Sequence, residues 1–270
     1  MNTKALCVSI ALMGTAGFTS TVMAGVACSA REGGCKAGKP AIASKAQSQV
    51  LPSQTAQAPT FYSPPLVAPI WTSPWGQTYG RWAAEWYQWA LGIPAAVNPL
   101  VDQDGSNCAQ RQVDAVWFLA GVPGSGSATR RCQIPVGKAL FFPLINTIYG
   151  AFLNDPANTR TETFVRNAGS CTEPARISVK IDGFQIPHPE KHFTGPSGSQ
   201  SPIFNVQLPP GNIFGLDENA AQELVLSPSA EQGYYLFVWP LKPGHHTIKW
   251  QASGCTAGAT QDITYHLLVK

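Results

Sequence analysis

Charged residues are scarce in this sequence, and neither sign dominates. Asp, Glu, Lys and Arg make up 12% of the 270 residues, and the formal net charge is +3 at pH 7. Such a weak balance gives no electrostatic reason to expect nucleic acid or a strongly anionic surface as a partner. After residue 24 the sequence also lacks any apolar run approaching the roughly 20 residues that a membrane-spanning helix needs. We therefore expect no integral membrane segment beyond the leader.

Motifs of well-characterised catalytic sites are missing as well. Residues 195–198 read Gly-Pro-Ser-Gly and fail the Gly-x-Ser-x-Gly pattern of a nucleophile elbow. Neither a phosphate-binding loop nor a dinucleotide-binding glycine fingerprint is present. We therefore expect no organic cofactor, and the sequence leaves open whether the protein is an enzyme.

The first 24 residues have the three parts of a secretory signal peptide. Lys4 supplies the positive charge, residues 5–17 are apolar or small, and residues 22–24 form a small-residue cleavage site. This predicts an extracytoplasmic protein, either periplasmic or secreted. Lipidation at Cys28 is the alternative, because residues 25–28 loosely resemble a lipoprotein box.

Removal of this leader would change the cysteine count from seven, which is odd, to six, which is even. An even set of cysteines in an exported, loop-rich protein predicts disulfide bonds. The six predicted disulfide cysteines are Cys28, Cys35, Cys108, Cys132, Cys171 and Cys255.

The positions of four of these cysteines suggest a pairing. Cys108 and Cys132 bracket a predicted strand, so we expect a bridge between them. Cys171 precedes one predicted strand and Cys255 precedes the last, which favours a second bridge. The remaining two either close a small loop on each other or attach the N-terminus to the main domain.

Composition divides the chain into a flexible segment and a folded domain. Residues 25–70 are predicted to form a flexible N-terminal segment, because from residue 36 onward they are rich in Ala, Ser, Gln, Pro and Lys with little periodicity, which is typical of a tether. Residues 71–270 carry many short apolar stretches separated by turn residues. Because such spacing is typical of all-β folds, we predict an antiparallel β-sandwich of the jelly-roll or immunoglobulin-like kind.

A few helices are expected within this sandwich. Trp82, Trp86 and Trp89 recur at the spacing of one helix face, which predicts a helix from Thr78 to Leu91. A capping-box pattern predicts a second helix over residues 160–167, and a weaker pattern covers 217–226. Strands are predicted at residues 115–120, 138–148, 203–208, 234–239, 246–250 and 263–269. A hairpin is predicted at 177–186, with its turn at residues 182 and 183.

Several stretches together resemble a group of secreted bacterial proteins of unassigned function. Residues 81–89 read RWAAEWYQW, residues 102–108 read DQDGSNC, residues 116–121 read VWFLAG, and residues 132–143 read CQIPVGKALFFP. The resemblance covers about residues 80–145 well and implies a bacterial, exported protein. It carries over no catalytic residue.

Glu85 is the acid that most suggests catalysis. It flanks the tryptophan stripe, and a desolvated carboxyl has the raised pKa that a general acid needs. Paired with Asp102 or Asp104 across a cleft, it would make the protein a secreted hydrolase. The alternative is an ion pair with Arg81, which lies four residues earlier on the predicted helix.

Two further groups of residues have the composition of metal sites. Asp102, Asp104 and Asn107 surround a glycine and offer the oxygen ligands that calcium prefers, although an Asp-Gly turn at a strand entry would have the same sequence. Residues 188–192 bring two histidines and a glutamate together. Prolines in this stretch exclude a helical zinc motif, so a solvated loop is the alternative.

Trp71 and Trp75 differ from the three tryptophans of the helix stripe. They lie in a proline-containing segment that approaches the domain, where an exposed indole ring can stack on a sugar or contact a partner. Our first hypothesis is therefore an exported β-sandwich protein that binds a surface partner or glycan without catalysis. The hydrolase is the alternative, and a structural protein of the cell envelope is a third interpretation.

Overall fold

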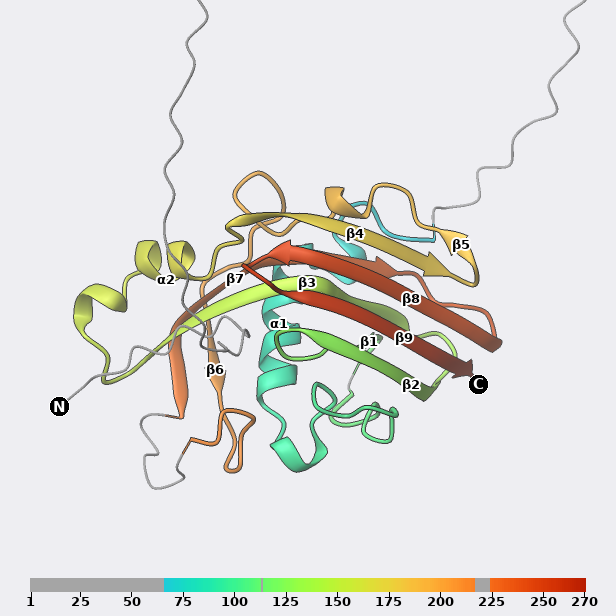
Figure 1. Cartoon of the computed structure of the whole chain (residues 1–270), viewed down its shortest axis with the longest axis horizontal. Helices are drawn as coiled ribbons and strands as arrows, with labels where there is room; N and C mark the ends of the chain where they lie inside the picture. Colours follow the sequence, from blue (N-terminus) through green and yellow to red (C-terminus); the bar gives the residue numbers. More distant parts are fainter. Residues whose placement is uncertain (1–65, 113, 217–223) are drawn as a thin grey trace, which may run out of the picture. The chain divides into compact units, whose positions relative to one another are not determined.

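The computed structural model describes residues 66–112, 114–216 and 224–270, which form two β-sheets and two α-helices (Figure 1). The four-stranded sheet has the order β1 (Val116–Phe118), β3 (Ala139–Phe152), β7 (Val225–Val238) and β6 (Phe204–Gln207). The five-stranded sheet has the order β2 (Gly126–Ile134), β9 (Thr260–Val269), β8 (Gly244–Cys255), β4 (Glu173–Ile181) and β5 (Phe184–Gln185).

The longer helix forms where its tryptophan periodicity predicted it. α1 spans Tyr79–Leu91, and the Thr78 side chain caps it by accepting a hydrogen bond from a first-turn backbone amide. All three tryptophans of the stripe are buried, and each indole N–H donates to a backbone carbonyl at 2.9–3.1 Å. These rings are therefore part of the core. The other helical elements are α2 (Glu162–Ala168) and the 3-10 turns η1 (Pro74–Gly76), η2 (Ala95–Val97), η3 (Ala157–Thr159) and η4 (Pro189–Lys191).

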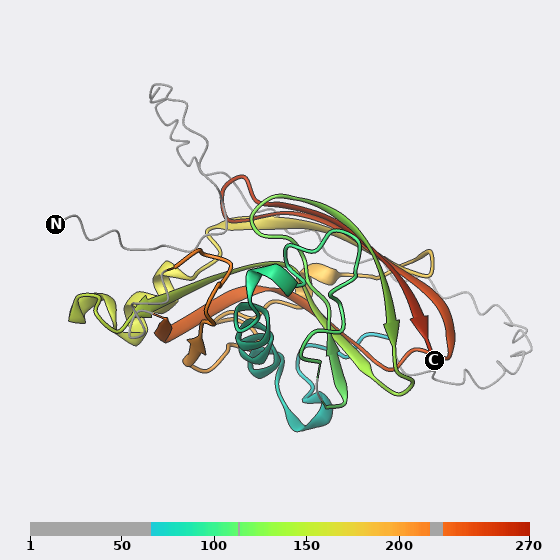
Figure 2. The same cartoon turned by 90° about the horizontal axis from the view of Figure 1, so that it is seen from below.

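Both faces of the four-stranded sheet are covered, which creates three layers. α1 packs on one face, and the five-stranded sheet packs on the other (Figure 2). Phe141 and Tyr235 belong to the core on the α1 side, whereas their chain neighbours Phe142 and Leu236 belong to the core between the sheets. A strand that is buried on both sides must be apolar throughout, which explains the continuous apolar run at the start of β3.

The sandwich prediction is confirmed, with two differences in detail. Both sheets are mixed, because β1 runs parallel to β3 and β2 runs parallel to β9. β2 was not expected, and β7 begins well before the predicted strand at 234–239. Of the weaker helix prediction, residues 217–223 lie outside the described residues, and residues 225 and 226 belong to a strand.

Two of the predicted disulfides are present. Cys108 bonds to Cys132 and Cys171 bonds to Cys255, which is the predicted pairing, although Cys132 lies within β2 and Cys108 in a loop. Each bridge is expected to add roughly 2–4 kcal/mol of stability, largely by restricting the unfolded chain. The two remaining cysteines predicted to pair, like the predicted leader, lie outside the described residues. Within the described part of the chain, no helix is both long and apolar enough to span a membrane.

Candidate functional site

A pocket of about 410 Å³ lies between two segments that are distant in the sequence. One segment leads into the domain before η1, and the other follows β5 and contains η4. Its volume falls within the range of roughly 300–1,000 Å³ that is usual for small-molecule sites. The pocket is lined by Leu66, Val67, Pro69, Ile70, Trp71, Ile186, Pro187, His188, Lys191 and His192.

Both pocket segments are held against the same edge of β7. Val67 forms an isolated bridge with Val238, and the amide of Ala68 donates to the carbonyl of Phe237 at 2.8 Å. Further along this edge, the amide of Tyr235 donates to the carbonyl of His192 at 3.0 Å. Backbone hydrogen bonds thus fix both walls to a central strand of the core, which makes the pocket a pre-formed feature of the fold.

The structure separates the two tryptophans that the sequence suggested as ligand-binding residues. Trp71 lines the pocket with 82% of its surface exposed. Trp75 is 45% exposed and packs against the ring of Trp239, at a centroid distance of 5.2 Å. Water contact over so much of an indole ring is unfavourable. Trp71 is therefore the aromatic side chain most available to a ligand.

The polar side chains of the pocket carry nitrogen atoms only. His188 and Lys191 are exposed, while His192 is half-buried, and burial lowers its pKa and keeps its ring neutral at pH 7. Glu190 lies outside the pocket lining and accepts a contact from Nδ1 of His188 at 3.2 Å. Among the described residues, no group of three His, Cys, Asp or Glu side chains is arranged to hold a metal ion.

The acidic loop after α1 is organised by its own backbone. Asp102 is buried, and its two carboxylate oxygens accept hydrogen bonds from the amides of Asp104, Gly105 and Asn107 at 2.9–3.1 Å. These donors occupy lone pairs that a calcium ion or a reacting proton would need. Within the described chain, no hydrogen bond or ion pair joins Glu85 to this loop or to Arg81. Calcium at the loop and a carboxylate pair with Glu85 stay predictions.

The acid that the structure does perturb is Glu231, which sequence reasoning missed. It lies on β7, 1% exposed, and its Oε2 accepts hydrogen bonds from Tyr235 at 2.8 Å and from Thr194 at 3.0 Å. Burial raises its pKa to about 8. Because this carboxyl is sealed from solvent, it has the acidity of a general acid but no access to a substrate. The available signal was its spacing from two other residues of β7. Glu231 lies two residues before Gly233 and four before Tyr235, so on a strand all three lie on the same face.

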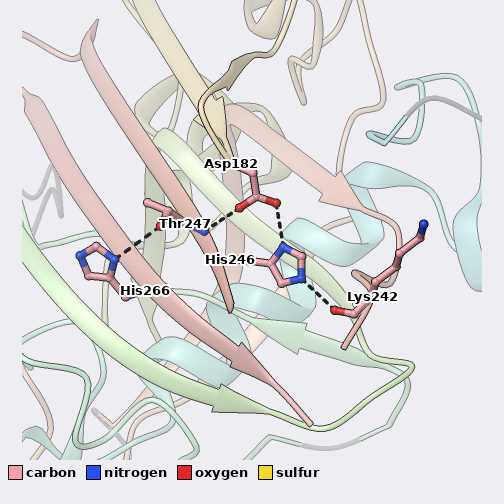
Figure 3. A network of polar contacts seen from close by, with 5 residues as sticks. All are labelled: Asp182, Lys242, His246, Thr247 and His266. Carbon is pink, nitrogen blue, oxygen red and sulfur yellow. Dashed lines mark hydrogen bonds and ion pairs between the residues drawn. The ribbon is translucent and has the colours of Figure 1, made fainter. Parts of the chain in front are cut away.

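A second polar cluster joins the β4–β5 turn to the start of β8 (Figure 3). Nδ1 of His246 lies 2.7 Å from Oδ2 of Asp182, and its Nε2 lies 2.8 Å from the carbonyl of Lys242. A carbonyl only accepts, so Nε2 must donate, and the carboxylate takes the other ring N–H. Both nitrogens of His246 are therefore donors, and no lone pair is left for general-base catalysis. The cluster holds a turn in place.

This geometry predicts a pH-dependent contribution of His246 to stability. Partial burial lowers its pKa, but the hydrogen bonds to Asp182 and Lys242 outweigh that effect and raise the pKa above 6.5. The stabilisation is thus complete below pH 6.5 and is lost as the pH rises through the folded-state value. We expect His246→Gln to lower the free energy of unfolding by about 1 kcal/mol near pH 5.5 and by less near pH 9.

Urea unfolding at both pH values would measure this difference. His245→Gln is the matched control, because His245 is the exposed chain neighbour and makes neither of these contacts. A deficit in the His246 variant that is the same at both pH values would show that its charge contributes nothing.

Comparison with known proteins adds no family. Neither a family model nor a curated protein sequence matches the chain. One similar solved structure is described as "Structure of PbICP-C in complex with falcipain-2". The similarity has a TM-score of 0.24 and 11% sequence identity over 58% of this chain and 100% of that chain. A TM-score this low supports no argument about fold or function.

Proposed function

We propose that the protein is an exported binding protein without catalytic activity, and that its ligand occupies the pocket beside Trp71. The observation that carries this proposal is a tryptophan, 82% exposed, on the wall of a pocket lined mainly by apolar side chains. A pre-formed apolar concavity with few polar groups is the usual form of a ligand site. The two disulfides support export, because such bonds persist in oxidising compartments.

An apolar ligand suits this pocket better than a glycan. Sugars present many hydroxyl groups, and each one that enters an apolar site without a partner costs free energy. Among the described residues that line the pocket, two histidines and one lysine are the polar side chains. Catalysis by the Asp102 carboxylate is disfavoured for a separate reason, since three backbone amides already hold its oxygens.

The proposal predicts that Trp71→Ala weakens the binding of a neutral apolar probe. The probe is N-phenyl-1-naphthylamine, whose fluorescence increases in an apolar environment. Loss of the indole ring should weaken its affinity roughly tenfold, as is common for an aromatic residue at the centre of a site. A fluorescence titration of the purified, oxidised protein measures the dissociation constant.

Trp75→Ala is the matched control, because Trp75 is also exposed but does not line the pocket. It should bind the probe as tightly as the unmodified protein. If both variants bind equally well, or if the unmodified protein shows no saturable binding, the pocket is not the ligand site. A parallel titration with chitotetraose tests the glycan alternative.

A further inference from the structure

The polar groups of the pocket indicate which kind of apolar ligand it accepts. All three are nitrogen-bearing side chains, and no carboxylate is among the lining residues. We propose that the ligand is an amphipathic carboxylate, with its apolar chain against Trp71 and its carboxylate held by Lys191. This inference rests on the proposed function and specifies the ligand class for the same pocket.

Lys191 supplies the positive charge. It ends η4 and is exposed, and within the described residues no carboxylate lies within ion-pair distance of its ammonium group. The nearby acid, Glu190, contacts the His188 ring at 3.2 Å instead. The mouth of the pocket thus has one cation whose charge a ligand carboxylate would complement.

His192 lies on the same wall but does not hold the ligand's charge. Its Nδ1 is sealed from solvent, so a ligand that enters the pocket does not reach this atom. Burial lowers the pKa of the ring, and backbone groups of His188, Ala68 and Pro189 lie close to it. His192 therefore contributes wall surface, and Lys191 is the residue that binds the carboxylate.

The apolar walls of the pocket indicate the chemistry of the rest of the ligand. Leu66, Val67, Ile70 and Ile186 bring aliphatic surface to the pocket, and the Trp71 ring adds a flat aromatic face. Binding in such an environment favours a hydrocarbon chain over a second charged group. The complementary molecule is therefore an apolar chain that ends in a single carboxylate.

The test compares decanoate with decanamide, which has the same chain and a neutral head. Isothermal titration calorimetry near pH 7 should show decanoate binding roughly tenfold more tightly, as expected for a charge-assisted hydrogen bond. Lys191→Met should abolish this preference, so that the variant binds decanoate no more tightly than decanamide. Lys180→Met is the matched control, because Lys180 is an exposed lysine of β4 that does not line the pocket.

The outcomes separate this inference from the proposed function. Equal affinity of the unmodified protein for the acid and the amide would overturn the carboxylate inference and leave an apolar binding pocket. Failure of both compounds, together with failure of the neutral fluorescent probe, would overturn the proposed function itself. An apolar tetrapeptide with a free or an amidated C-terminus identifies the source, since tighter binding of the free peptide than of decanoate would assign the carboxylate to a peptide end.

Discussion

Replacing Arg130 with methionine should lower the free energy of unfolding by roughly 3–5 kcal/mol, because it leaves several buried carbonyl groups without donors. Arg130 lies on β2 with 0% of its surface exposed. Its Nε donates to the carbonyl of Asp102 at 2.7 Å, and its two terminal nitrogens both donate to the carbonyl of Gly121 at 3.0 Å. The same group also donates to Tyr265 Oη at 3.0 Å.

The position of Arg130 explains why one side chain has so large an effect. Its guanidinium joins the loop after α1 to the segment after β1, and the ring of Tyr265 on the adjacent strand β9 lies 5.5 Å away. Neutral acceptors surround the charge, so its burial is compensated by a full set of hydrogen bonds and not by an ion pair. Methionine fills a similar length of space but provides no donor, so the carbonyls of Asp102 and Gly121 lose these hydrogen bonds.

Arg131→Met is the matched control for this prediction. Arg131 is the next residue on the same strand, but its side chain is exposed, so its loss should change stability by no more than about 0.5 kcal/mol. Urea unfolding of the oxidised proteins, followed by circular dichroism, measures both values. A loss below about 1 kcal/mol for Arg130→Met would show that water replaces the guanidinium at little cost.

Arg130 also shows why part of the fold was not predictable from the sequence. β2 alternates buried and exposed residues as a strand should, but one of its inward positions is an arginine. The hydrophobic periodicity of β2 is therefore interrupted at Arg130, and this strand was not predicted. α1 and the two disulfides were predicted because their signals are local: a tryptophan stripe, and cysteines at strand ends. Parallel pairing of β1 with β3 depends on long-range register, which no local pattern encodes.

Part of the candidate site was likewise predictable from local sequence and part was not. Trp71 was identified from its own neighbourhood, because a tryptophan in a proline-containing approach segment has little reason to be buried. Lys191 and His192 were not linked to it, since they meet it only through backbone hydrogen bonds to β7. A local sequence pattern can therefore indicate a single residue of a site, such as Trp71. Which other residues lie beside it depends on how both segments pair with β7.

Glu231→Gln should stabilise the protein at alkaline pH by roughly 3–5 kcal/mol. Burial raises the pKa of Glu231 from 4.5 to about 8, so between these values the folded protein holds a proton that the unfolded chain has released. The contribution of the protonated group to stability is complete below pH 4.5 and is lost as the pH rises to about 8. The loss follows a slope of about 1.4 kcal/mol per pH unit.

Glutamine imitates the protonated carboxyl but cannot ionise. Its carbonyl oxygen can still accept the hydrogen bonds from Tyr235 at 2.8 Å and Thr194 at 3.0 Å. The variant should therefore match the unmodified protein below about pH 4.5, and the two stability curves should separate as the pH rises. Because His246 titrates in both proteins, the difference between the curves isolates the buried carboxyl.

Urea unfolding over a series of pH values from about 4 to about 9 measures this divergence. Glu173→Gln is the control, because Glu173 is an exposed glutamate of β4, and its variant should keep the slope of the unmodified protein. Parallel curves for Glu231→Gln and the unmodified protein would mean that the carboxyl is ionised in the folded state at neutral pH. In that case Oε1 of Glu231 would need a donor, which the buried hydroxyl of Ser201 beside it can supply. If the two stability curves separate as the pH rises, the folded protein holds a proton on Glu231. Loss of that proton at alkaline pH would then destabilise the protein.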